Sequence, residues 1–290
     1  MTTTSPDLTA PVAELADRTT AGRRPGTGAT AALAVLVRRR FSLSVRTPRE
    51  VLVPLMTPVF FALIIAPALD SIGPDIPGLD YMSFSAIGTA GLLIPLNCMF
   101  AGIGVIVDRD SGPRRDLLAA PIARPMLVLA NLVVALAITA LQVSVLLVAA
   151  VLRGAELDGS ASGIGWFVGA ALLLTIAMYG VSETLANRIP TVEEFTGALP
   201  AVAILPFFFA GLYPITALPW ALTGFARLLP LTHALALMRY GLLGNATGLE
   251  DIWGMGGTAT KAALSLTVLA AFAALLTAVA VRTFNRTAVR

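Results

Sequence analysis

Long stretches without a charged residue recur along the chain. With Asp, Glu, Lys and Arg as boundaries, these stretches are 51–69, 81–107, 125–152, 159–182, 195–226 and 262–281. A helix needs about 20 apolar residues to cross roughly 30 Å of hydrocarbon, whereas a surface helix of a soluble protein is apolar on one side only. The pattern predicts an all-α integral membrane protein with six transmembrane helices, at about 51–69, 82–107, 126–152, 164–186, 197–219 and 262–281.

The segments outside these stretches predict two further features. Residues 1–29 are polar and predict a disordered cytoplasmic tail, so the membrane domain is expected over 30–290. Residues 30–47 mix apolar residues with Arg38, Arg39 and Arg40, which indicates an amphipathic helix lying in the membrane interface. Between spans five and six, prolines and an apolar stretch too long for a tight turn predict re-entrant or short outer helices.

Composition and charge distribution support a membrane protein and orient it. Hydrophobic residues make up 57% of the chain and charged residues 13%, against about 25% charged in soluble domains. Of the 20 basic residues, eight lie in 1–50, four in 108–125, one at Arg188 and three after 281. Basic residues near spans are retained in the cytoplasm, so both termini are expected there. The basic N-terminus is then a topology signal and a lipid contact, with no nucleic acid implied.

The scarcity of lysine points to the source of the chain. Lys261 is its only lysine, while arginine, alanine and glycine are abundant. We interpret this as the product of a GC-rich bacterial genome, which places the protein in a bacterial plasma membrane as a multi-pass protein.

Several kinds of chemistry are missing from the sequence. Lys261 does not follow a glycine, so no phosphate-binding P-loop is present. His233 is the only histidine and Cys98 the only cysteine, which excludes HExxH zinc sites and disulfides within the chain. We therefore expect no enzyme activity, no metal site and no cofactor in this chain.

Glu183 is the acid nearest to a span centre, about one turn from the cytoplasmic end of span four. It is either a substrate or coupling contact or a polar residue at a helix end. The absence of an acid at mid-membrane argues against a proton- or sodium-coupled carrier.

The polar block between spans two and three carries the strongest candidate site. Gly112-Pro113 breaks the helix, and Arg114 to Ala120 can form a short helix that Pro121 ends. Its charged face would dock on a partner while Leu117 and Leu118 pack on the membrane domain. The alternative is an ordinary basic loop.

Two runs of residues resemble a known family. The first is Asp108-Arg-Asp-Ser-Gly followed by Leu117-Leu-Ala-Ala-Pro-Ile-Ala-Arg124. The second is Pro219-Trp220 followed by Leu229-Pro-Leu-Thr-His-Ala-Leu-Ala-Leu-Met-Arg239. Both resemble motifs of type-2 ATP-binding-cassette exporter permeases, which include the daunorubicin-resistance-like multidrug and antibiotic exporters. This chain departs from the family pattern at Pro113, Asn131 and Leu229, where Thr, Gly and Asn are usual.

The resemblance implies a permease that pairs with itself or a homologous permease and binds two cytoplasmic ATPase subunits, which carry the ATP and Mg²⁺. It assigns ATPase coupling to Asp108, Arg109, Asp110, Gly112, Arg114, Arg115, Asp116, Leu117, Leu118, Pro121 and Arg124. The interface helix with Arg38, Arg39 and Arg40 would also touch the ATPase. The candidate substrate path comprises Glu183, Phe207, Phe208, Tyr213, His233 and Arg239.

The function that follows is export of an amphipathic drug, antibiotic or lipid-like molecule, with ATP hydrolysed by the separate subunit. The alternatives are a polysaccharide or glycolipid exporter permease, a gradient-driven carrier, and a non-transporting membrane scaffold. Charge reversal at Arg114, Arg115 and Asp116 is expected to uncouple hydrolysis from export and leave the fold intact. Gly165-x-x-x-Gly169 predicts a close helix contact, either between two copies or inside the chain.

Overall fold

The structure, a computed structural model, describes residues 28–46, 80–119 and 123–287 together with positions 52, 56, 59, 60, 63 and 64. The expected tail, apart from its last residues, and most of the expected first span lie outside the described residues, as do Pro121 and the side chains of Arg115 and Asp116.

The described chain is built from helices and connecting turns. In order they are α2 (Ala29–Arg46), α5 (Tyr81–Asp110), α6 (Pro113–Ala119), α7 (Pro125–Leu152), α8 (Ala161–Ala186), α9 (Val192–Leu199), the π-helical η2 (Pro200–Ile204), α10 (Leu205–Ala210), the 3₁₀ turn η3 (Ile215–Ala217), α11 (Trp220–Ala226), α12 (Pro230–Leu243), α13 (Thr247–Ile252) and α14 (Thr258–Thr287). Five stretches in this part are long and apolar enough to cross a membrane, or six if α11 and α12, bent by 81°, count as one. The prediction of an all-α integral membrane protein is confirmed.

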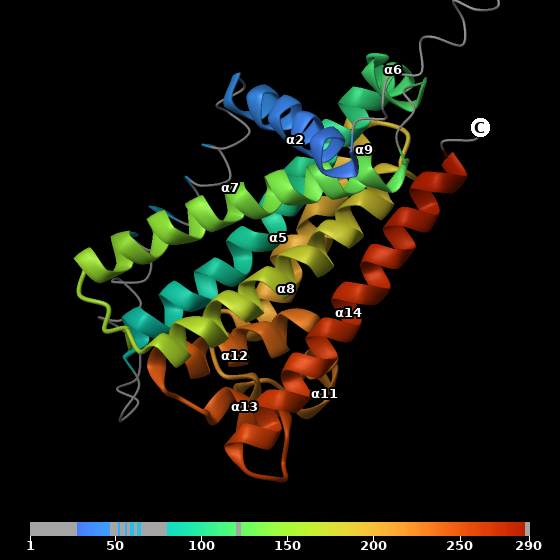
Figure 1. Cartoon of the computed structure of the whole chain (residues 1–290). Helices are drawn as coiled ribbons and strands as arrows, with labels where there is room; N and C mark the ends of the chain where they lie inside the picture. The colour runs from blue at the N-terminus through green and yellow to red at the C-terminus, as the bar shows by residue number, and fades with distance from the viewer. Residues whose placement is uncertain are drawn as a thin grey trace, which may run out of the picture.

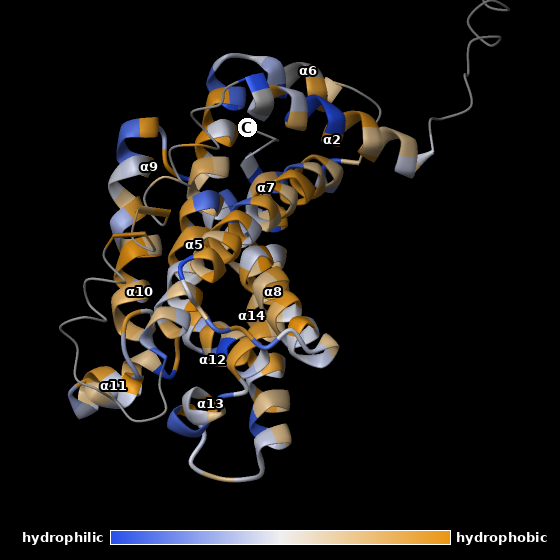
Figure 2. Cartoon of the chain, turned by 90° about the vertical axis from the view of Figure 1, so that its left-hand side faces the viewer, coloured by the Kyte–Doolittle hydropathy of each residue, from blue (hydrophilic) through white to orange (hydrophobic). Residues whose placement is uncertain are grey.

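The bundle has two distinct ends (Figure 1). α2, α6 and the end of α14 lie at one end, called here the α6 end, and α11 to α13 lie at the other, called here the α12 end. Hydrophobic residues dominate along α5, α7 and α8, while α2 and α13 carry hydrophilic patches (Figure 2). The predicted short helices before the last span are present as α11, α12 and α13.

The fifth span differs from its predicted bounds of 197–219. The structure has a continuous helical stretch from Val192 to Ala210. It starts early because the Thr191 hydroxyl caps it, accepting a hydrogen bond from the Glu194 amide at 3.3 Å. Pro200 lacks an amide hydrogen, and the helix widens there into a π-turn instead of ending.

Small residues let α8 lie against two neighbouring helices. A β-carbon on Gly163 would lie 2.2 Å from the Gly241 carbonyl oxygen of α12. One on Gly180 would lie 2.7 Å from the Leu276 carbonyl carbon of α14. By contrast, β-carbons on Gly165 and Gly169 would meet nothing within 4 Å. The close contact predicted inside the chain for Gly165-x-x-x-Gly169 is therefore wrong within the described residues, and the contact between two copies stays a prediction.

Gly163→Val is expected to destabilise the protein by about 2 kcal/mol, because the helices must separate to admit the side chain. Gly197→Val, at an exposed helical position where a β-carbon would meet nothing within 4 Å, is the matched control and is expected to change stability by less than about 0.5 kcal/mol. Thermal unfolding of the purified variants in one detergent measures both effects. Equal midpoints for the two variants would contradict the close approach of α8 and α12.

Candidate functional site

The link between α5 and α7 is a separate short helix at the α6 end. Gly112 has a φ of 99°, a left-handed conformation that a β-carbon disfavours. Pro113 then occupies the first position of α6, where its missing amide hydrogen costs nothing. The break and the short helix lie where the sequence predicts them.

The side chains of α6 anchor it to the bundle. Leu117 and Leu118 are partly buried and pack on the main hydrophobic core, as expected. Arg114, expected on the partner-facing side, is instead buried, with 8% of its surface exposed. Arg124 lies exposed just before α7.

The acid at the end of α5 holds the N-terminal helix. The two carboxylate oxygens of Asp108 lie 3.6 Å from Arg39 and 3.8 Å from Arg40 of α2. Arg40 also donates to the Ala101 carbonyl at 3.4 Å. A β-carbon on Gly104 would lie 1.8 Å from the Arg40 guanidinium, so the glycine makes room for this contact. Arg38 points away and is exposed.

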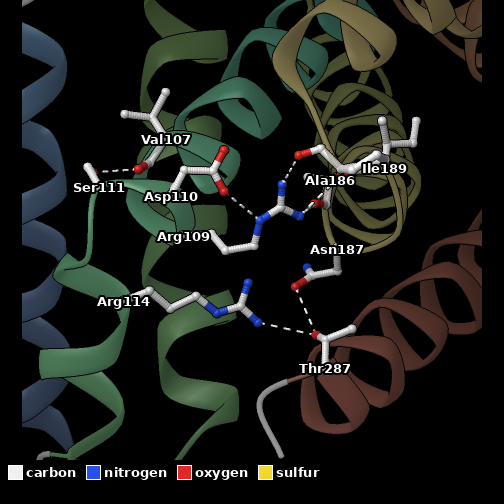
Figure 3. A network of polar contacts seen from close by, with 10 residues as sticks. Val107, Arg109, Asp110, Ser111, Arg114, Ala186, Asn187, Ile189 and Thr287 are labelled. Atoms are coloured by element: carbon white, nitrogen blue, oxygen red, sulfur yellow. Dashed lines mark hydrogen bonds and ion pairs between the residues drawn. The ribbon is translucent and has the colours of Figure 1, made fainter. Parts of the chain in front are cut away.

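Arg109 closes the C-terminal end of α8 (Figure 3). Its guanidinium donates to the carbonyls of Ala186 at 2.9 Å, Ile189 at 3.1 Å and Pro190 at 2.5 Å. The last carbonyls of a helix lack partners within the helix, and Arg109 supplies one. Its Nε donates at 2.9 Å to the carboxylate of Asp110, which is largely exposed. The end of α5 is thereby fastened to the end of α8.

Arg114 connects α6 to α14. It donates to the Thr287 hydroxyl at 3.2 Å, and its guanidinium carbon lies 4.6 Å from the centre of the Phe284 ring. Burial lowers the pKa of Arg114 from its ordinary value, and nearby Glu183 opposes this shift while Arg109 adds to it. Arg114 is therefore a buried arginine on the side of α6 that faces the bundle.

The contacts of Arg114 continue into the membrane domain. The Thr287 hydroxyl shares its one hydrogen among the Asn187 side-chain oxygen at 3.2 Å and the Thr283 and Phe284 carbonyls at 3.1 Å. The Asn187 amide donates to Glu183 at 2.8 Å. Tyr179 donates to the other Glu183 oxygen at 2.7 Å, and Glu183 is 1% exposed. We call the chain Arg114–Thr287–Asn187–Glu183–Tyr179 the α6 relay. It joins α6, α14 and almost two turns of α8 by hydrogen bonds.

The residues predicted for a substrate path do not come together around one cavity in the described part. Glu183 belongs to the α6 relay, near the opposite end from the others. Phe207 is buried against α5, and Phe208 is 49% exposed. His233 is buried: one ring nitrogen lies 3.0 Å from the Arg227 carbonyl and the other 3.2 Å from the Ser265 hydroxyl. His233 thus links α12 to the turn after α11 and to α14. Tyr213 is partly buried in the turn after α10.

Arg239 ties α12 to the end of the fifth span. Its guanidinium donates to the carbonyls of Ala210 at 2.9 Å and Gly211 at 2.8 Å. It also lies 3.5 Å from the centre of the Phe84 ring in α5. A β-carbon on Gly88 would lie 2.0 Å from the Gly211 carbonyl oxygen, so α5 touches the same point. We call this cluster the Arg239 latch.

Sequence reasoning missed part of the α6 relay. Tyr179, Glu183 and Asn187 are spaced four residues apart, which places them on one side of a helix and is a detectable signal. Thr287 and Phe284 gave no such signal, because their partner Arg114 is far away in sequence.

In 28–46, 80–119 and 123–287, no group of three or more His, Cys, Asp or Glu is placed to hold a metal ion. At the α6 end, α6 is hydrogen-bonded to α14 and through it to α8, while the adjoining end of α5 binds α2 and the end of α8.

A protein-family model described as ABC-2 type transporter matches residues 31–243, from the third residue of α2 to the end of α12, and includes α6. Among curated proteins, no match is found.

Proposed function

Because the chain belongs to the ABC-2 type transporter family and is a permease of an ABC transporter, we propose that it is the membrane subunit of an ATP-driven exporter. A separate cytoplasmic subunit, present in two copies, hydrolyses ATP, and two permeases together form the path. The cargo is an amphipathic drug, antibiotic or lipid-like molecule. The α6 end faces the cytoplasm in this proposal, in agreement with the distribution of arginines.

The observation that carries the proposal is the attachment of α6. A helix that only linked two spans would need no buried bonds to other elements. α6 instead reaches α14 and α8 through the α6 relay, and the adjoining end of α5 binds both α2 and the end of α8. A partner that pushes on α6 therefore displaces several spans at once, which is what an ATPase outside the membrane requires.

The proposal is tested by isolating the complex. The tagged chain is purified from its native membranes in mild detergent, with and without crosslinking. We expect a stoichiometric soluble partner that carries the phosphate-binding P-loop absent from this chain. A pure homo-oligomer in both preparations would contradict the proposal and favour a carrier or scaffold.

Charge reversal in α6 tests the docking surface. The reversal is restricted to Arg115→Glu with Asp116→Arg, because Arg114 is buried and its reversal would disturb the fold. Like charges placed opposite each other across an interface cost several kcal/mol, so we expect the amount of co-purified ATPase to fall about tenfold. The amount is measured by quantitative mass spectrometry, and the unfolding midpoint is expected to stay unchanged.

Glu156→Arg is the matched control for this reversal. Glu156 is an exposed acid at the α12 end, and its side chain has no hydrogen bond or ion pair within the described residues. It is expected to retain the full complement of ATPase. Normal ATPase recovery with the Arg115→Glu, Asp116→Arg variant would remove α6 from the docking surface.

A further inference from the structure

A long groove runs between α8 and α14 on the outside of the bundle. Leu173 and Ile176 of α8 form one wall, and the other wall is a single face of α14 from Ala270 to Arg286. Its volume is 1310 Å³, above the roughly 300–1,000 Å³ usual for a drug-sized ligand. α8 and α14, which carry the two walls, lie side by side in the bundle (Figure 1).

The groove has one apolar part and one basic part. Its α14 wall from Ala270 to Val281 is made of alanines, one threonine and one valine, and it ends in Arg282, Asn285 and Arg286 at the α6 end. At 1.5 Å per residue the apolar part is about 16 Å long, close to half of the roughly 30 Å hydrocarbon core. Its length therefore matches the acyl chains of one membrane leaflet.

The basic end of the groove has no bonding partner among the described residues. Arg282 and Arg286 are exposed, line the groove and make no hydrogen bond or ion pair with any described residue. They stand four residues apart on one helix face, where like charges repel. An anion between them would remove this repulsion, and the Asn285 amide lies beside them as a further hydrogen-bond donor.

One polar atom inside the apolar part is also unsatisfied. The Thr277 hydroxyl is buried and has no hydrogen-bond partner among the described residues, although Thr277 lines the groove. Thr267 on the same helix instead donates to the Ala263 carbonyl one turn back. Thr277 lies five residues before Arg282, so its hydroxyl is about 7.5 Å nearer the membrane centre. The groove therefore has one polar position below its basic end.

We propose that this groove binds one anionic phospholipid from the leaflet at the α6 end. The phosphate lies between Arg282 and Arg286, and an acyl chain fills the apolar part between α8 and α14. The lipid holds α14 against α8 and so supports the helix that carries Thr287 of the α6 relay. The proposal goes beyond the transport function and does not require the ATPase.

The test uses the full-length chain purified in detergent and mixed with vesicles of palmitoyl-oleoyl phosphatidylglycerol or palmitoyl-oleoyl phosphatidylcholine. Native mass spectrometry counts the lipids that stay bound to each chain. Two arginines at an anionic headgroup are expected to give a preference of roughly thirtyfold for the phosphatidylglycerol. The Arg282→Gln, Arg286→Gln variant is expected to lose this preference.

A charge-matched control separates a site from general attraction to the membrane. Arg124→Gln with Arg188→Gln removes the same charge from exposed residues at the same end that do not line the groove. This variant is expected to keep the preference. Ala274→Phe, which fills the groove without changing charge, is expected to abolish retention of the lipid.

Three outcomes would overturn the proposal. Equal retention of the two lipids would show ordinary solvation by lipid. Loss of the preference in the Arg124→Gln, Arg188→Gln control would show attraction to net charge alone. If Ala274→Phe separates a dimer into monomers and leaves lipid retention unchanged, the groove is a contact between two copies.

Discussion

Replacing Arg239 by methionine is expected to lower the unfolding midpoint of the purified chain by about 10 °C. Arg239 is buried and donates to the carbonyls that end the fifth span, Ala210 and Gly211. Methionine keeps most of the side-chain volume but leaves both carbonyls without a donor and removes the contact with the Phe84 ring. Each buried carbonyl left without a donor costs about 1–3 kcal/mol, and the two together correspond to this shift for a chain of this size.

The effect is measured by thermal unfolding followed by size-exclusion chromatography. Arg153→Met is the matched control, because Arg153 is exposed after α7 and its side chain makes no bond to a described residue. Gly88→Ala acts on the same latch from α5, since its β-carbon would overlap the Gly211 carbonyl oxygen. We expect the unfolding midpoint to be lowered in Arg239→Met and in Gly88→Ala. We expect it to stay unchanged in Arg153→Met. A stable Arg239→Met variant would show that the latch carries little of the stability.

The fold was predictable because its main signal is local. Charge-free stretches of spanning length predict α5, α7, α8 and α14 to within a few residues, since each helix depends on its own composition. The fifth span was predicted less well. Its prolines suggested that the helix is interrupted, but Pro200 is accommodated by a π-turn and the span begins at the Thr191 cap. Whether a helix ends or continues at a proline depends on tertiary packing, which the sequence pattern does not contain.

The site was predictable in position but not in orientation. Gly112-Pro113 and the leucines at 117 and 118 mark a short helix resting on the bundle, and the structure agrees. A sequence cannot tell which charges of such a helix face inward. Arg114 points inward because it contacts Thr287 and Phe284 of α14, which lie more than 160 residues further along the chain. Partners so distant in sequence leave no local pattern.

Replacing Arg114 by methionine is expected to separate ATP hydrolysis from movement of the permease. This expectation rests on the proposed exporter function. Arg114 is the first member of the α6 relay and the link from α6 to α14. Methionine retains apolar contact with Phe284 but cannot donate to Thr287, so motion of α6 no longer reaches Asn187 and Glu183 through hydrogen bonds. Docking through the outer side of α6 is preserved, so the ATPase still binds and turns over.

The readout is a fluorescent label at the far end of the bundle. Cys98 is the only cysteine, so Cys98→Ala with Trp220→Cys gives one labelling site, at a residue 89% exposed in α11. In the complex with the ATPase, we expect ATP with vanadate to change the fluorescence of this label. The Arg114→Met variant is expected to lose at least about nine-tenths of that change while it hydrolyses ATP. A loss of this size is expected because the α6 relay is the main path by which motion of α6 reaches the other helices in the proposed mechanism.

Two comparison variants distinguish transmission from damage to the fold. Arg188→Met removes an exposed arginine in the turn after α8, whose side chain makes no bond to a described residue and which is not among the coupling residues, and it is expected to behave like the parent. Arg114→Lys keeps the charge beside Glu183 but lacks the planar fork, so an intermediate response is expected. If Arg114→Met lowers the unfolding midpoint as much as Arg239→Met does, the residue is chiefly structural. If its fluorescence response is intact, the α6 relay does not transmit the ATPase motion, and the bonds of Asp108 and Arg109 to α2 and α8 become the remaining route.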